Sequence, residues 1–96
     1  MLVLITYDVE TITPAGRKRL RKVARQCINF GQRVQNSVFE CLIEPAQFAD
    51  LKHHLETIID KEKDSIRYYY LGNAWKNKIE HCGVNQNFDM EGPLLV

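Results

Sequence analysis

The sequence is short of the features that define several classes of protein. Its three cysteines, Cys27, Cys41 and Cys82, are odd in number and have no C-x-x-C spacing, which argues against a disulfide framework or a zinc knuckle and for a reducing compartment. No apolar run approaches the roughly 20 residues that a membrane span needs. The apolar opening also lacks the basic flank and cleavage site of a signal peptide. We therefore expect one cytoplasmic domain with a single core and no membrane partner.

Acidic residues are missing from one long stretch. Between Thr11 and Phe39 the chain has no Asp or Glu, although it has 12 of them in total. The same stretch holds seven of the 13 basic residues. A solvated helix face would normally include glutamate for i,i+4 pairing, so this basic segment favours a partner that carries phosphate. Because guanidinium pairs well with phosphate, the candidate phosphate contacts are Arg17, Arg19, Arg21, Arg25 and Arg33.

The chain opens on a predicted strand. Residues 1–8 include five aliphatic or methionine side chains and no charge before Asp8. That composition is typical of a strand that is buried on both faces. A carboxylate at the end of a rigid strand is well placed for chemistry. The alternative is that Asp8 starts the following turn or caps a helix.

Apolar periodicity predicts two helices. The first runs from about residue 14 to residue 30, with Gly31 as its C-cap. Its apolar stripe is Leu20, Val23, Ala24, Cys27 and Phe30. The second helix begins at Pro45, a residue suited to the first turn. Its stripe is Phe48, Leu51, Leu55, Ile58 and Ile59.

Further segments have the pattern of strands. Residues 32–43 are long for one strand, so we expect two pieces, 32–35 and 36–43, with a bend between them. Residues 65–71 form the next strand, and residues 78–81 a short last one. These elements fit an α+β domain, a ferredoxin-like split βαβ sandwich with an antiparallel sheet and two helices on one face.

Two helices leave the other face of such a sheet uncovered. The first strand and the one at residues 65–71 are apolar on both sides, so that face needs a cover. A homodimer would provide it. The apolar tail, residues 93–96, would then pair with the sheet edge of the partner subunit as a swapped C-terminal strand.

Several segments resemble the small CRISPR-associated endonuclease family, the "Cas-two" adaptation proteins. They are the strand ending in Tyr7-Asp8, the basic helix, the run Arg33-Val34-Gln35-Asn36-Ser37-Val38-Phe39-Glu40, Pro45 and the run Asp64-Ser65-Ile66-Arg67-Tyr68-Tyr69. The resemblance spans essentially the whole chain, and its Y-D and Q-N-S-V-F-E motifs are quite specific. The matching positions are Tyr7, Asp8, Arg17, Arg19, Arg33, Ser37 and Phe39.

The resemblance implies a function as well as a fold. It implies a ferredoxin-like homodimer with a swapped C-terminal strand. It also implies a metal-dependent nuclease acting on RNA or double-stranded DNA, with Asp8 as the ligand of Mg²⁺ or Mn²⁺ and with Tyr7, Ser37 and Phe39 among the catalytic candidates. A role in spacer acquisition follows, in which the dimer bridges dimers of an integrase partner protein.

The chemistry of such a site poses a problem of ligand number. Mg²⁺ takes six oxygen ligands, so one carboxylate per chain is too few for a protein cage. Two copies of Asp8 across a dimer axis could share one ion, with waters and phosphate oxygens as the other ligands. The sequence shows no obvious second acidic ligand or general base. A non-catalytic adaptor that bridges integrase dimers on duplex DNA is therefore the alternative. A small-molecule regulatory dimer is disfavoured by the basic segment.

Other candidate residues have ordinary interpretations. His53 and His54 would point about 100° apart on a helix and could not chelate one ion together. Phe39 could stack on a base, but packing in a core at the dimer seam is favoured. Cys41 with a distant His81 lacks the environment that activates a thiol.

Overall fold

A computed structural model describes residues 1–83 of the chain. Its elements are β1 (Leu2–Asp8), α1 (Pro14–Ile28), β2 (Gly31–Gln35), β3 (Val38–Leu42), α2 (Pro45–Ile58), β4 (Ser65–Gly72) and the short 3₁₀ helix η1 (Trp75–Asn77). The tail at residues 93–96, with its predicted pairing to a partner subunit, lies outside the described residues. No helix within residues 1–83 is long and apolar enough to cross a bilayer.

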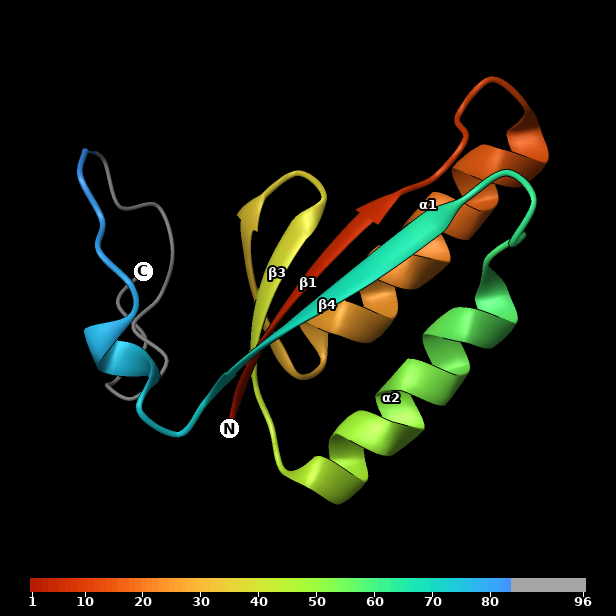
Figure 1. Ribbon diagram of the computed structural model, residues 1–96. Coiled ribbons are helices and arrows are strands. Elements are labelled where there is room, and N and C mark those ends of the chain that lie inside the picture. Colours follow the sequence, from red (N-terminus) through yellow and green to blue (C-terminus); the bar gives the residue numbers. More distant parts are fainter. Residues whose placement is uncertain (84–96) are drawn as a thin grey trace.

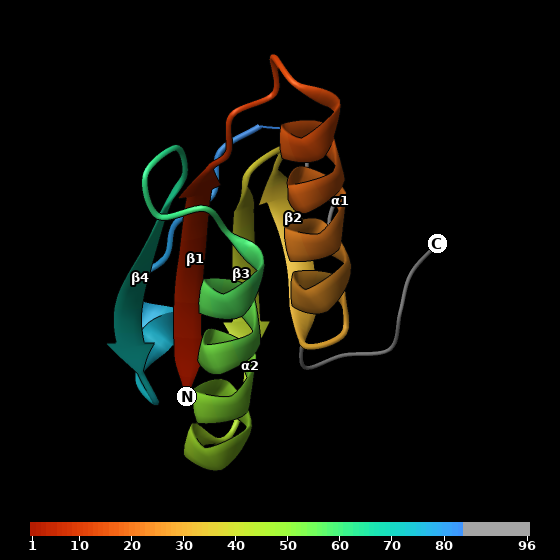
Figure 2. The same cartoon turned by 90° about the vertical axis from the view of Figure 1, so that its right-hand side faces the viewer.

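The four strands form one antiparallel sheet in the order β2-β3-β1-β4. β1 is therefore an inner strand, and β4 is an edge strand of the sheet within residues 1–83. Figure 2 shows that α1 and α2 lie together on the same side of the sheet. The predicted α+β, ferredoxin-like arrangement with both helices on one face is confirmed.

The burial of side chains along β1 alternates because the helices cover only one face of the sheet. From Val3 onward the strand alternates, with Val3, Ile5 and Tyr7 buried, Leu4 and Thr6 half-buried and Asp8 exposed. The buried side chains belong to the core that lies between the sheet and the helices. Within this single chain β1 is thus fully buried on one face only, and cover of the other face by a second copy stays a prediction.

The predicted stripe of α1 is confirmed, since Val23, Ala24 and Cys27 are buried in the core and Leu20 and Phe30 pack against it. The end of the helix differs from the prediction. α1 ends at Ile28 with Asn29 as its C-cap, and Gly31 is the first residue of β2. A Cβ atom at Gly31 would collide with the Glu40 carbonyl of β3. Close approach of two strands, not a helix cap, therefore requires this glycine.

The predicted start and stripe of α2 also agree with the structure. The helix begins at Pro45, and the Glu44 backbone N–H donates a hydrogen bond to Gln47 Oε1 at 3.2 Å. Phe48, Leu51 and Leu55 are buried, and Ile58 and Ile59 pack against the same core. This anchors α2 along the side of the sheet that α1 also covers.

The predicted bend between residues 32 and 43 is a turn at Asn36 and Ser37, after which β3 begins at Val38. The predicted strand at residues 78–81 is wrong. The Lys78 backbone N–H closes η1 by donating to Trp75 O at 2.9 Å, and no strand follows as far as residue 83. In Figure 1 this segment leaves the sheet on the side away from the two helices. Four alternating residues are too few to specify a strand without a neighbouring edge to pair with.

Candidate active site

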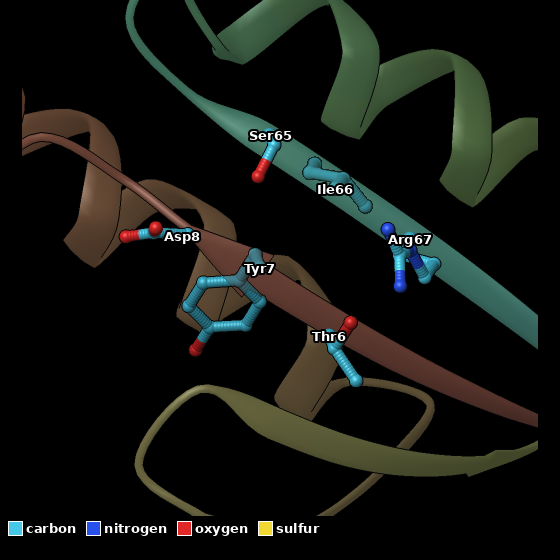
Figure 3. Close-up of a pocket in the computed structure, with 6 residues that line it drawn as sticks. All are labelled: Thr6, Tyr7, Asp8, Ser65, Ile66 and Arg67. Carbon is cyan, nitrogen blue, oxygen red and sulfur yellow. The ribbon is translucent and has the colours of Figure 1, made fainter.

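Asp8 is the last residue of β1 and lies opposite Ser65, the first residue of β4. It is exposed, and within residues 1–83 its carboxylate has no hydrogen bond or ion pair. A hollow of about 240 Å³ lies beside it between the two strands, and Figure 3 shows the side chains around this hollow. The hollow is lined by Thr6, Tyr7, Asp8, Ser65, Ile66 and Arg67. The carboxylate is thus held on a rigid strand and is free to bind a ligand.

The donor set of a divalent metal site is incomplete in one chain. A carboxylate suits Mg²⁺ or Mn²⁺, but these ions take about six oxygen ligands. Residues 1–83 contain no group of three or more His, Cys, Asp or Glu side chains that could hold an ion. A site at Asp8 therefore fits only if waters, substrate or a second chain provide the other ligands.

Tyr7 and Ser37 fasten the end of β1 to the turn between β2 and β3. The Tyr7 backbone N–H donates to Ser37 O at 3.1 Å, and the Tyr7 hydroxyl donates to Asn36 O at 3.3 Å. Burial raises the pKa of the Tyr7 hydroxyl. With only 5% of its surface exposed, Tyr7 supports the strand end that carries Asp8.

Phe39 is fully buried in the core that faces the helices. Its ring lies 6.2 Å from that of Tyr7, centroid to centroid, and the Arg33 guanidinium lies 5.2 Å from its centroid. Stacking on a base is incompatible with this burial. The core packing is confirmed, and it occurs within one chain, between the sheet and the helices. Arg33 is exposed, and its guanidinium lies over the ring of Phe39.

The basic residues of α1 do not form one cluster around Asp8. Arg21 and Arg25 are exposed, with no hydrogen bond or ion pair inside the described part of the chain. Arg17 donates from Nη1 to Thr11 O at 3.0 Å and to Ile12 O at 3.1 Å, so it also braces the loop before the helix. Arg67 was not predicted, yet it lines the hollow beside Asp8.

Arg19, unlike Arg17, Arg21 and Arg25, is paired with a buried carboxylate. Its Nε donates to Asp64 Oδ2 at 2.7 Å and its Nη2 donates to Asp64 Oδ1 at 3.3 Å. A second carboxylate, that of Glu10, lies 3.6 Å from Nη2. The Asp64 side chain is 0% exposed and that of Arg19 only 16%. The guanidinium of Arg19 therefore has an internal carboxylate partner, and its predicted role as a phosphate clamp stays a prediction.

Asp64 has a perturbed pKa with opposing causes. Burial raises the pKa of its carboxyl, while the hydrogen bonds from Arg19 and from the backbone N–H groups of Asp60 and Glu10 lower it, and the net pKa is lowered. Only a pairing across 45 residues could have indicated its role, and no local pattern carries that signal.

The thiol and imidazole candidates show no sign of a site. Cys41 is buried, and desolvation raises the pKa of its thiol to about 12, so it is no nucleophile. His53 and His54 are exposed neighbours on α2, and their ring centroids lie 6.2 Å apart.

The fold agrees with the comparison to known protein structures. The chain belongs to the family of the CRISPR associated protein Cas2, whose sequence profile matches residues 1–79. This family assignment agrees with the resemblance that the sequence motifs indicate.

Individual relatives match over nearly their whole length. The "CRISPR-associated endonuclease Cas2" of Halalkalibacterium halodurans is 58% identical over 95 residues, which are 99% of each chain. The "CRISPR-associated endoribonuclease Cas2" of Nitratidesulfovibrio vulgaris is 56% identical over 96 residues, which are 100% of this chain and 94% of the relative. A crystal structure of Streptococcus pyogenes Cas2 is 61% identical, with a TM-score of 0.76, and the match covers 86% of this chain and 100% of that one.

Proposed function

We propose that the protein is a Mg²⁺- or Mn²⁺-dependent endonuclease that hydrolyses phosphodiesters of DNA or RNA in CRISPR spacer acquisition. The observation that carries this proposal is Asp8, an exposed carboxylate at the end of the inner strand β1 with no partner in residues 1–83. Members of its family are named endonucleases and endoribonucleases. A partnerless carboxylate on a rigid element is the kind of group that such chemistry requires.

The proposal requires a homodimer, because one chain offers one metal-binding carboxylate. In the dimer, Asp8 of each chain would bind the ion, which when bound would polarise the scissile phosphate and make a bound water more acidic. The open face of the sheet supports a second copy, since Leu4, Val38 and Leu42 are only half-buried there. Arg67, at the hollow beside Asp8, would hold a phosphate oxygen of the substrate.

The test of this function is a cleavage assay on labelled RNA and on labelled duplex DNA. Wild type should cleave one or both substrates with Mg²⁺ or Mn²⁺ and should stop when EDTA is added. Asp8→Ala, purified in parallel, should show no cleavage above the buffer control. Equal cleavage by the two proteins would contradict the proposal and would indicate a contaminating nuclease or another site.

Exposed cations of α1 are proposed to bind the nucleic-acid backbone. Arg21→Gln/Arg25→Gln should weaken binding to duplex DNA and flatten the slope of log K against log salt by about 0.9 for each phosphate that the variant no longer neutralises. The matched control is Lys61→Gln, which removes an exposed charge from the loop before β4 and should leave the slope unchanged. Fluorescence anisotropy at several salt concentrations measures both slopes. An unchanged slope in the double variant would mean that this helix face is only solvated surface.

A second candidate function is a non-catalytic adaptor that bridges dimers of an integrase partner on duplex DNA. The observation that favours it is the incomplete ligand set around Asp8 within residues 1–83. In that case neither wild type nor Asp8→Ala cleaves, whereas both bind duplex DNA with the same salt dependence.

A further inference from the structure

We infer that Arg19 and Asp64 are positioning residues, which place Asp8 through the backbone and make no contact with nucleic acid. This inference rests on the proposed function of Asp8. It assigns a role to a buried ion pair that joins α1 to the loop before β4.

Two chain segments connect this ion pair to Asp8. Asp8 pairs in the sheet with Ser65, the residue that directly follows Asp64. The backbone N–H of Glu10, two residues beyond Asp8, donates to Asp64 Oδ1 at 3.0 Å. The segment that carries Asp8 is therefore held on one side by the β pairing and on the other by the Asp64 carboxylate.

Asp64 cannot itself be a metal ligand or a general base. Its Oδ1 accepts from the Glu10 N–H and from Arg19 Nη2, and its Oδ2 accepts from Arg19 Nε and from the Asp60 N–H at 2.9 Å. A carboxylate offers about four lone-pair sites, so in the folded state these four bonds leave none free for a metal ion or for a proton from the substrate. The side chain is also fully buried. Its role must therefore be exerted through the groups that it binds.

The other end of the connection between Asp8 and α1 is fixed as well. Glu10 accepts from the Thr13 N–H at 2.7 Å and from the Thr13 hydroxyl at 2.8 Å, while Thr13 caps α1 by accepting from the Gly16 N–H at 3.1 Å. A Cβ atom at Gly16 would collide with the Glu10 carbonyl, so glycine permits this close approach. Arg19, one turn further along α1, completes the loop by binding Asp64. Loss of either member of the pair should loosen the segment that begins at Asp8.

The experiment compares Arg19→Gln, Asp64→Asn and the double variant with Arg21→Gln as the matched arginine control. Cleavage kinetics should show kcat lowered by about tenfold to a hundredfold in each single variant, as for other groups that orient a metal ligand, with KM unchanged. The double variant should lose no more than the worse single variant, because the two side chains act as one unit. Arg21→Gln should instead raise KM and leave kcat unchanged.

The binding of duplex DNA, measured in EDTA, tests the inference without depending on cleavage. The slope of log K against log salt should be unchanged in Arg19→Gln and flatter by about 0.9 in Arg21→Gln. A slope that flattens equally in both variants would overturn the inference, because Arg19 would then contact phosphate. Multiplicative losses of kcat in the double variant would overturn it as well. If wild type does not cleave at all, the proposed function fails, while the slopes still decide whether Arg19 binds phosphate.

General destabilisation is separated from positioning by two further measurements. Leu55→Ala truncates a buried residue of α2, away from Asp8, and should leave kcat unchanged at a temperature where all variants are folded. An equal loss of kcat in Leu55→Ala would overturn the inference. Amide hydrogen exchange at Glu10 should be faster in Asp64→Asn than in Leu55→Ala, and equal exchange would contradict the proposed clamp.

Discussion

Replacing Asp64 by alanine is expected to lower the free energy of unfolding by about 3 kcal/mol, because removal of one partner from a buried ion pair leaves the other groups unsatisfied. The change would leave the Arg19 guanidinium without its bidentate partner and the Asp60 and Glu10 N–H groups without acceptors. Urea denaturation at neutral pH measures the effect. Glu62→Ala is the matched control, since it removes an exposed carboxylate from the same loop and should change stability by about 0.5 kcal/mol or less. Similar midpoints for the two variants would contradict the role assigned to Asp64.

The same carboxylate predicts a direction for the pH dependence of stability. The folded pKa of Asp64 is lowered relative to its ordinary value, so the folded state favours the ionised form. Its contribution is fully present above the unfolded pKa and is lost as pH falls through the folded pKa. Wild type should therefore lose stability on acidification over that range more steeply than Asp64→Asn. Parallel curves for the two proteins would show that Asp64 is not linked to folding.

Asp8→Asn is expected to have opposite effects on activity and on stability. Cleavage should be abolished, because the amide is a poor ligand for Mg²⁺ or Mn²⁺ compared with a carboxylate. Without metal, the variant should be as stable as wild type or more stable, since two carboxylates brought together in a dimer repel each other. DNA binding should remain mostly intact, because the phosphate contacts lie on other residues.

Thermal denaturation with and without Mn²⁺ checks the stability part of this prediction. Wild type should melt at a higher temperature when Mn²⁺ is present, whereas Asp8→Asn should not respond, because a ligand stabilises only the state that binds it. Equal responses in both proteins would place the metal elsewhere. Cleavage by Asp8→Asn at the wild-type rate would show that the chemistry does not depend on this residue.

Local patterns in the sequence were sufficient for most of the fold. Helical periodicity identified the buried stripe of α1, from Leu20 to Phe30, and the turn at Asn36 and Ser37 followed from the excessive length of a single strand. Asp8 stood out because it ends an uncharged strand. Each of these features is decided within one element or by its immediate neighbours.

The features that the sequence did not predict depend on contacts between distant elements. The pairing of Arg19 with Asp64 joins residues 45 positions apart, so neither side chain has a local signal that separates it from solvated charge. Gly31 was misread because a helix cap and a close strand contact both favour glycine. One-sided burial of β1 likewise depends on which layers cover the sheet, which composition does not specify.

The most direct test of the account is the binding of Mn²⁺ at Asp8, followed by the electron paramagnetic resonance signal of the free ion. Wild type and Asp8→Asn would each be titrated with Mn²⁺ while bound to the same uncleavable phosphorothioate strand. The strand itself then binds the same number of ions in both titrations, so any difference comes from the protein. A contaminating nuclease cannot contribute a stoichiometric amount of bound metal. The account predicts that wild type binds one more Mn²⁺ per two chains than Asp8→Asn. Equal binding by the two proteins would contradict it.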